Sequence, residues 1–252
     1  MESLETKVVK SLDGENNELY NFIPYLLQDL WEIGASPEVI IDMVEKHMGK
    51  SDISVLDLGC GKGAVSVKLA KTIGCKVKGI DAVEDFIDYA RNKAEQFGVN
   101  DICKFEIGDI RECIEENHDL VIFGACGDVL GDFDTTLKKL KGMVKKGGLI
   151  IIDDAYCEND KKINGYLTHE EVIEIFKQNK VELIQEDLVA EEAQEDMNER
   201  NNQNIIQRAN ELKKKYPEKS QIFDDYVKSQ LEECEVMENE IICVTWLLRK
   251  ME

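Results

Sequence analysis

The residues best suited to chemistry in this chain are an acid followed by alternating glycines: Asp57, Gly59, Gly61 and Gly63. An apolar run over 53–58 precedes them and predicts a buried strand, and a helical pattern over about 62–73 follows. Glycines at a strand-to-helix turn allow the backbone to turn sharply and to approach a ligand closely. The pattern therefore indicates a nucleotide-type binding unit.

The charge of Asp57 narrows the choice of ligand. Gly59, Gly61 and Ala64 also satisfy the dinucleotide pattern G-x-G-x-x-A. A pyrophosphate on the following helix would meet the negative charge of Asp57, whereas an amino group and a sulfonium would be attracted to it. A nicotinamide-dependent oxidoreductase is thus disfavoured but stays as an alternative, as does an Asp57 that only caps a tight turn.

These residues resemble motif I of the class I S-adenosylmethionine-dependent methyltransferases, E/D-x-G-x-G-x-G. Asp81 ends the second predicted strand, where a carboxylate can accept hydrogen bonds from both ribose hydroxyls; the alternative is a helix cap. In this family an acid after the third strand accepts from the adenine amino group, and Asp109 with Ile110 matches. The resemblance implies S-adenosylmethionine as cofactor, held by Asp57, Gly59, Cys60, Gly61, Gly63, Asp81, Ala82, Asp109, Ile110, Phe123 and Gly124.

No residue is identified as catalytic by the sequence. Asp154 and Tyr156 follow the fifth predicted strand at the edge that faces the ligand in open α/β sheets, so they are the leading candidates for contact with the acceptor. Loop packing is the alternative for both. Asp128 and Asp132 lie in the loop after the fourth strand and are more typical of solvated carboxylates. That loop lacks the N/D-P-P-Y/F tetrapeptide of methyltransferases that modify amide or exocyclic nitrogens.

The surrounding elements alternate between strands and helices, which predicts a parallel sheet with helices on both faces. Helices are expected at about 83–97, 111–116, 134–145 and from a Thr168 capping box to about 178. The strands are expected at 53–58, 76–81, 103–107, 119–123, 148–153, 181–188 and 241–249. We therefore predict an α/β, Rossmann-like, seven-stranded, mostly parallel sheet; the resemblance places the last strand antiparallel between the fifth and sixth.

The remaining segments are helical and polar. We predict N-terminal helices over 1–50 that pack on or cap the site, the methyltransferase domain over 51–190 and 241–252, and a helical insertion over 191–240. The insertion is expected to be a lid, with a dimer contact as the alternative. It should break at Tyr216-Pro217 and kink or loop at 201–204.

At the N-terminus, residues 1–15 look loosely ordered and 17–32 form one amphipathic helix that Gly34 ends. Ser36 then caps a second helix. The aromatic residues of the first helix are expected mostly in the core, with one or two in the pocket; they are Tyr20, Phe22, Tyr25 and Trp31.

Composition limits the partners. The formal net charge of -21 repels phosphate backbones and anionic lipid, so neither nucleic acid nor membrane is expected as a partner. Eight cysteines without a C-x-x-C pair and three histidines predict no metal site. Without a targeting segment we expect a cytoplasmic protein, monomer or homodimer. The predicted function is methyl transfer to a small-molecule acceptor, and the alternative is a non-catalytic module that senses the cofactor.

Overall fold

The structure is a computed structural model that describes residues 2–49, 52–163 and 165–251. The chain divides into two compact units. One contains Trp31–Leu188 and Cys243–Glu252, and the other contains Met1–Leu30 and Val189–Ile242. The predicted boundary between residues 50 and 51 lies outside the described residues.

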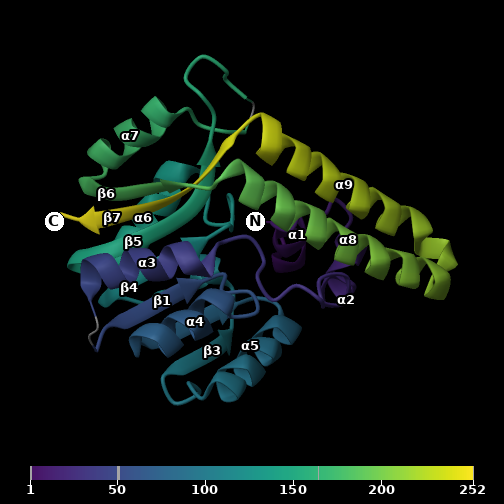
Figure 1. Ribbon diagram of the computed structural model, residues 1–252, viewed down its shortest axis with the longest axis horizontal. Helices are drawn as coiled ribbons and strands as arrows, with labels where there is room; N and C mark the ends of the chain where they lie inside the picture. Colours follow the sequence, from purple (N-terminus) through teal and green to yellow (C-terminus); the bar gives the residue numbers. More distant parts are fainter. Residues whose placement is uncertain (1, 50–51, 164, 252) are drawn as a thin grey trace. The chain divides into compact units, whose positions relative to one another are not determined.

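A seven-stranded sheet forms the centre of the first unit (Figure 1). Its strand order is β3-β2-β1-β4-β5-β7-β6, and the β6–β7 pair is antiparallel while the β1–β2, β1–β4, β2–β3 and β4–β5 pairs are parallel. The predicted fold class and the position of the last strand are therefore confirmed. The strands are β1 (Ser54–Leu58), β2 (Lys76–Asp81), β3 (Cys103–Ile107), β4 (His118–Gly124), β5 (Val144–Tyr156), β6 (Val181–Leu188) and β7 (Ile242–Lys250).

The strand register brings the chemically interesting residues to one edge. Asp57 is level with Gly79 of β2, and Gly124 is level with Asp153 of β5. Because these strands are parallel, their carboxyl ends meet at the same edge of the sheet. The middles of β1, β4 and β5 are mostly apolar and buried, so the centre of the sheet supports that edge.

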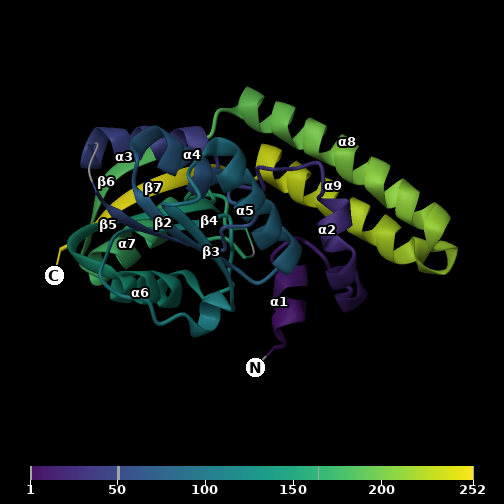
Figure 2. The same cartoon turned by 90° about the horizontal axis from the view of Figure 1, so that it is seen from below.

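Helices cover both faces of the sheet, as predicted. Figure 2 shows α3 and α4 on one face and α6 and α7 on the other. Thr168 begins α7 with the predicted capping box, in which its hydroxyl accepts from the backbone of Glu171. The helices of this unit are α3 (Pro37–Met48), α4 (Ala64–Ile73), α5 (Glu84–Phe97), α6 (Phe133–Met143) and α7 (His169–Gln178).

The second unit is helical and combines the N-terminal segment with Val189–Ile242. Phe22 packs edge-on against Tyr216 and Phe223, with ring centroids 5.3 and 5.0 Å away. The predicted break at Tyr216-Pro217 is confirmed. The elements are α1 (Leu4–Lys10), η1 (Asn17–Asn21), α2 (Ile23–Leu26), α8 (Glu191–Lys215), η3 (Pro217–Lys219) and α9 (Ser220–Asn239). None of the described helices is long and apolar enough to cross a membrane.

Two expectations for the N-terminus are wrong. Residues 1–15 contain α1, because the Ser3 side chain caps it and Val9 is fully buried. The continuous helix over 17–32 is instead η1 followed by the short α2. Pro24 has no backbone N–H to donate, so the helix restarts there, and α2 ends at Leu26, well before Gly34.

Three smaller expectations also fail. The helix over 111–116 is only a short turn, η2 (Ile110–Glu112), because the backbone becomes extended at Cys113. Residues 201–204 neither kink nor loop: α8 is continuous, and Asn202 packs against α9 by donating to the Cys234 sulfur at 3.2 Å. Ser36 precedes α3 but makes no side-chain cap bond.

Candidate functional site

The glycine turn between β1 and α4 has the backbone that only glycine adopts easily. Gly59, Gly61 and Gly63 have φ of 68°, 51° and 72°. A Cβ on Gly59 would lie 2.3 Å from the Cys126 sulfur, whereas a Cβ on Gly61 would meet nothing within 4 Å. The turn is therefore closely packed at Gly59, whereas the space beside Gly61 is open.

Asp57 lies beneath this turn as a buried carboxylate. It is 4% exposed and accepts a hydrogen bond of 2.6 Å from the Ser66 hydroxyl. Burial raises the pKa of Asp57 to about 6, and the nearby charge of Asp81 adds to this. Among the described residues, no lysine or arginine pairs with Asp57. A cationic ligand at the turn would supply the missing positive charge.

Asp81 is directed at the same turn from the end of β2. Its two carboxylate oxygens accept from the backbone N–H groups of Gly61 and Val83, each at 2.9 Å. Burial raises the pKa of Asp81 despite these bonds. The carboxylate thus ties the glycine turn to the start of α5, and it retains lone pairs for further donors. The N-cap residue of α5 is Val83 and makes no side-chain cap bond, so Asp81 is not the helix cap of the alternative prediction, and its ligand-binding role stays a prediction.

Asp109 and Ile110 follow β3, as the resemblance requires. Asp109 receives a forked ion pair from Arg111, with an Nε–Oδ1 distance of 2.9 Å, and this hydrogen bonding lowers the pKa of Asp109. Ile110 is buried, and its Cδ1 would be 3.9 Å from a Cβ on Gly59. The segment that follows β3 therefore lies close to the glycine turn.

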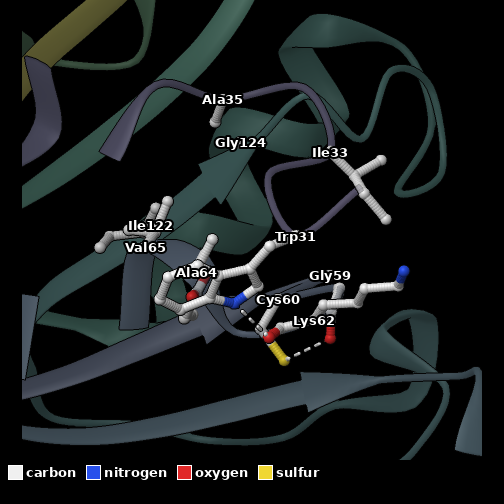
Figure 3. A pocket seen from close by; sticks show the side chains of 12 residues that line it. Trp31, Ile33, Ala35, Gly59, Cys60, Lys62, Ala64, Val65, Ile122 and Gly124 are labelled. Atoms are coloured by element: carbon white, nitrogen blue, oxygen red, sulfur yellow. Dashed lines mark hydrogen bonds between the residues drawn. The ribbon is translucent and has the colours of Figure 1, made fainter. Parts of the chain in front are cut away.

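A pocket opens beside the turn (Figure 3). One wall is the segment 31–35, and the indole nitrogen of Trp31 donates to the Lys62 carbonyl at 3.1 Å. The Trp31 ring is held from outside by Phe97, at 5.3 Å, and by the Lys93 ammonium, at 4.6 Å. The pocket is lined by Trp31, Ile33, Ala35, Asp57, Gly59, Cys60, Gly61, Lys62, Ala64, Val65, Ile122 and Gly124.

Comparison with known proteins identifies the family. A family described as "Methyltransferase domain" matches residues 49–218, more than half of the chain. The chain belongs to this methyltransferase family. The resemblance to class I S-adenosylmethionine-dependent methyltransferases is thereby confirmed, together with the cofactor of that class.

Relatives of this methyltransferase differ in what their names say they act on. The chain is 31% identical over 121 residues to "Ribosomal protein L11 methyltransferase" of Dictyoglomus turgidum, covering 47% of this chain and 38% of that protein. It is 33% identical over 114 residues to "Probable cobalt-precorrin-6B C(15)-methyltransferase (decarboxylating)" of Saccharolobus solfataricus, covering 43% of this chain and 56% of that one. The chain thus spans about half the length, or less, of these proteins.

Solved structures support the fold. A methyltransferase from Geobacter sulfurreducens in complex with S-adenosyl-L-homocysteine superposes with a TM-score of 0.77 at 17% identity, covering 90% of this chain and 97% of that one. A similarity at this identity shows that the two chains share a fold.

The end of β4 and the loop that follows it are closely packed near the glycine turn. Phe123 is buried, and a Cβ on Gly124 would lie 2.8 Å from the Ala35 Cβ. Cys126 is directed back at the turn, and its sulfur donates to the Gly124 carbonyl at 3.3 Å and the Leu58 carbonyl at 3.5 Å. No sequence signal singled out Cys126; its role as packing beneath Gly59 depends on the fold.

The residues predicted to contact the acceptor have different surroundings in the structure. Asp154 is partly exposed at the end of β5, next to Asp153, which sequence reasoning passed over and which accepts from the Thr245 hydroxyl at 2.7 Å. Tyr156 is buried, with its ring 6.1 Å from Trp246, an arrangement that favours the packing alternative. Asp128 is exposed.

Two further predicted candidates have structural explanations. Asp132 caps α6 by accepting from Thr135 N, so its carboxylate is occupied. Trp31 is the predicted aromatic that does line the pocket, whereas Phe22 packs in the helical unit. Within the described part of the chain, no group of three or more His, Cys, Asp or Glu side chains is arranged to hold a metal.

Proposed function

We propose that this protein transfers a methyl group from S-adenosylmethionine to a small-molecule acceptor. The observation that carries the proposal is Asp57, a buried carboxylate beside the glycine turn that has no cationic partner among the described residues. A buried carboxylate is costly unless a cation compensates it. The ammonium and sulfonium of S-adenosylmethionine supply that compensation, whereas the pyrophosphate of a nicotinamide cofactor would add negative charge.

The predicted cofactor residues fit this ligand. Asp57 faces its charged methionyl end, and Asp81 offers lone pairs for the ribose hydroxyls. We assign Asp109 and Ile110 to the adenine, and the position of Ile110 close to Gly59 supports this assignment. Cys60, Gly61, Gly63, Ala82, Phe123 and Gly124 complete the surface through backbone and apolar contacts.

Methyl transfer from this cofactor requires the protein mainly to align the reacting groups. The bound cofactor supplies a methyl group already activated by its sulfonium. The residues of this chain hold the reacting groups in line and exclude water. A general base is needed only where the acceptor atom is protonated at the working pH. This requirement explains why no diagnostic catalytic residue stands out.

The acceptor is proposed to be small. The loop after β4 lacks the tetrapeptide of enzymes that modify amide or exocyclic nitrogens, and the net charge of -21 disfavours nucleic acid and anionic membrane. One relative is named as a methyltransferase of a ribosomal protein and another as a methyltransferase of a cobalt-precorrin, so their names do not single out an acceptor. A cytoplasmic location and a monomeric or homodimeric state stay predictions.

We also propose that the segment 191–240 acts as a lid over the acceptor. The segment 191–240 is long, polar and hairpin-shaped, and closure of such a segment excludes water from a transfer site. Hydrogen exchange of the full protein tests this role. Amides of α8 and α9 should slow when S-adenosylhomocysteine and acceptor bind together; unchanged exchange alongside a concentration-dependent molecular mass would favour the dimer contact.

Two measurements test the main proposal. Calorimetry should show binding of S-adenosylhomocysteine and no binding of NAD. A metabolite extract incubated with methyl-labelled S-adenosylmethionine should then yield a labelled small molecule. Binding of the cofactor without turnover in any extract would support the non-catalytic sensor instead, and binding of NAD would support the oxidoreductase.

A further inference from the structure

The strap, residues 31–35, forms one wall of the pocket beside the glycine turn. Trp31, Ile33 and Ala35 line the pocket, and Figure 3 shows the strap running from the turn to the end of β4 at Gly124. The strap and the rest of the pocket lining belong to the same compact unit, the one that contains the sheet. Any movement of the strap would therefore change the shape of the pocket.

The pocket is small with the strap in this position. Its volume is about 30 Å³, which holds roughly two water molecules. Pockets that bind a ligand as large as S-adenosylmethionine have volumes on the order of 300 Å³ or more. A ligand of that size therefore enters after part of the pocket lining has moved away.

The two ends of the strap are firmly held. The indole of Trp31 donates to the Lys62 carbonyl at 3.1 Å, and its ring packs against Phe97 and lies beneath two lysine ammonium groups. Glu32 forms an ion pair with one of these lysines. Beyond the other end, the chain enters α3 at Pro37, which is buried. Movement is therefore expected between these two anchored ends.

The middle of the strap packs against the loop after β4. A Cβ on Gly34 would lie 2.3 Å from the Ala125 Cβ, and a Cβ on Gly124 would lie 2.8 Å from the Ala35 Cβ. Gly34 and Ala125 are both exposed, with φ of 82° and 51°. The left-handed region is unfavourable for alanine, so the backbone at Ala125 is strained. A surface contact that is strained on one side separates at lower cost than the anchored ends.

We infer that the strap is a gate for the cofactor. Its middle lifts off the loop after β4 to admit S-adenosylmethionine and closes again while its ends stay in place. S-adenosylhomocysteine leaves through the same opening. This inference rests on the proposed function and adds a step that controls exchange of the cofactor, whereas the lid proposed for 191–240 acts on the acceptor.

The first experiment measures the gate in the wild-type protein. Stopped-flow mixing with S-adenosylhomocysteine follows binding through tryptophan fluorescence. Because opening of the strap precedes binding, the observed rate should approach a plateau as the ligand concentration increases. An association rate constant near the diffusional limit, with a rate linear in concentration, would overturn the inference. Absence of binding in calorimetry would instead contradict the proposed function.

The second experiment holds the gate open. Gly34→Ala places a Cβ 2.3 Å from the Ala125 Cβ, so the strap cannot close fully. The association and dissociation rate constants should both rise by about tenfold or more, because opening no longer limits either step. The affinity measured by calorimetry should change by less than either rate constant. Faster dissociation with unchanged association would show that the strap is a wall of the pocket and not a gate, and would overturn the inference.

A rescue and a control separate the contact from backbone strain. Ala125→Gly removes the overlapping atom, and the next atom near the added Cβ is the Ala125 Cα, at 3.8 Å. Combining Gly34→Ala with Ala125→Gly should therefore return both rate constants to within about threefold of wild type. Gly74→Ala is the control, because Gly74 has φ of 80° but a Cβ there would meet nothing within 4 Å. Rate constants in Gly34→Ala equal to those in Gly74→Ala would overturn the inference.

Discussion

The two halves of the sheet edge are built differently. On the side proposed for the cofactor, Asp57 accepts from Ser66, Asp81 from Gly61 and Asp109 from Arg111. These partners are near in sequence or on the adjacent turn. On the acceptor side, Asp153 depends on Thr245 from the last strand, and Asp154 has only its neighbour's amide. Local contacts therefore fix the acids around the glycine turn, whereas the acids at the end of β5 depend on a distant strand or on a single neighbouring amide.

The largest effect is expected from breaking the packed turn. Gly59→Ala places a Cβ 2.3 Å from the Cys126 sulfur at a residue with φ of 68°. Steric overlap and backbone strain together should lower the free energy of unfolding by about 2–4 kcal/mol. Chemical denaturation measures this loss, and calorimetry should show cofactor binding lost or strongly weakened.

A matched glycine separates strain from packing. Gly127 has φ of 52°, but a Cβ there would meet nothing within 4 Å. Gly127→Ala should therefore cost only the strain, about 1 kcal/mol. Cys126→Ala in the Gly59→Ala background should recover part of the stability by removing the sulfur. Equal losses in the two glycine variants would show that the contact with Cys126 does not matter.

A smaller effect is expected at the wall of the pocket. Trp31→Phe keeps an aromatic ring but removes the donor to the Lys62 carbonyl, so affinity for S-adenosylhomocysteine should fall roughly three- to tenfold. Tryptophan fluorescence gives a second readout, because Trp31 lines the pocket while Trp246 is fully buried elsewhere. The fluorescence change on cofactor binding should survive Trp246→Phe and vanish in Trp31→Phe; the reverse would remove Trp31 from the site.

The smallest effect concerns pH. Burial raises the pKa of Asp57 from 3.8 to about 6, so the folded protein binds this proton more tightly than the unfolded chain does. The contribution of Asp57 to stability is therefore present below about pH 4 and is lost as pH rises through about 6. Asp81, next to Asp57, also has a raised pKa and acts in the same direction.

Cofactor affinity should change in the opposite sense. Ionised Asp57 attracts the cationic ligand, so affinity for S-adenosylmethionine should increase several-fold between pH 5 and pH 7. Calorimetry at the two pH values measures the change. Asp57→Asn should weaken binding and flatten the pH dependence. An equally steep dependence in that variant would assign the titration to another group.

The fold and the positions of the acids around the glycine turn were predictable because their signals are local. Alternating apolar runs predicted a mostly parallel sheet, and the family resemblance predicted the position of the last strand. The glycine turn and its acids directly follow predicted strands. The helix over 17–32 failed because Pro24 interrupts an apolar pattern that is otherwise helical. The Asp153–Thr245 bond and the contact of Trp31 with the Lys62 carbonyl join residues far apart in sequence, so no spacing rule announces them.

We propose that Asp57, the glycine turn and Asp81 together hold S-adenosylmethionine. Calorimetric titration of S-adenosylhomocysteine into wild type and Asp81→Ala tests it most directly, with Asp101→Ala as the exposed control. Loss of a charged hydrogen-bonding partner should cost about 1.5–3 kcal/mol, a weakening of roughly 10- to 150-fold, while the control keeps wild-type affinity. An Asp81→Ala protein that folds and binds as tightly as wild type would contradict the claim.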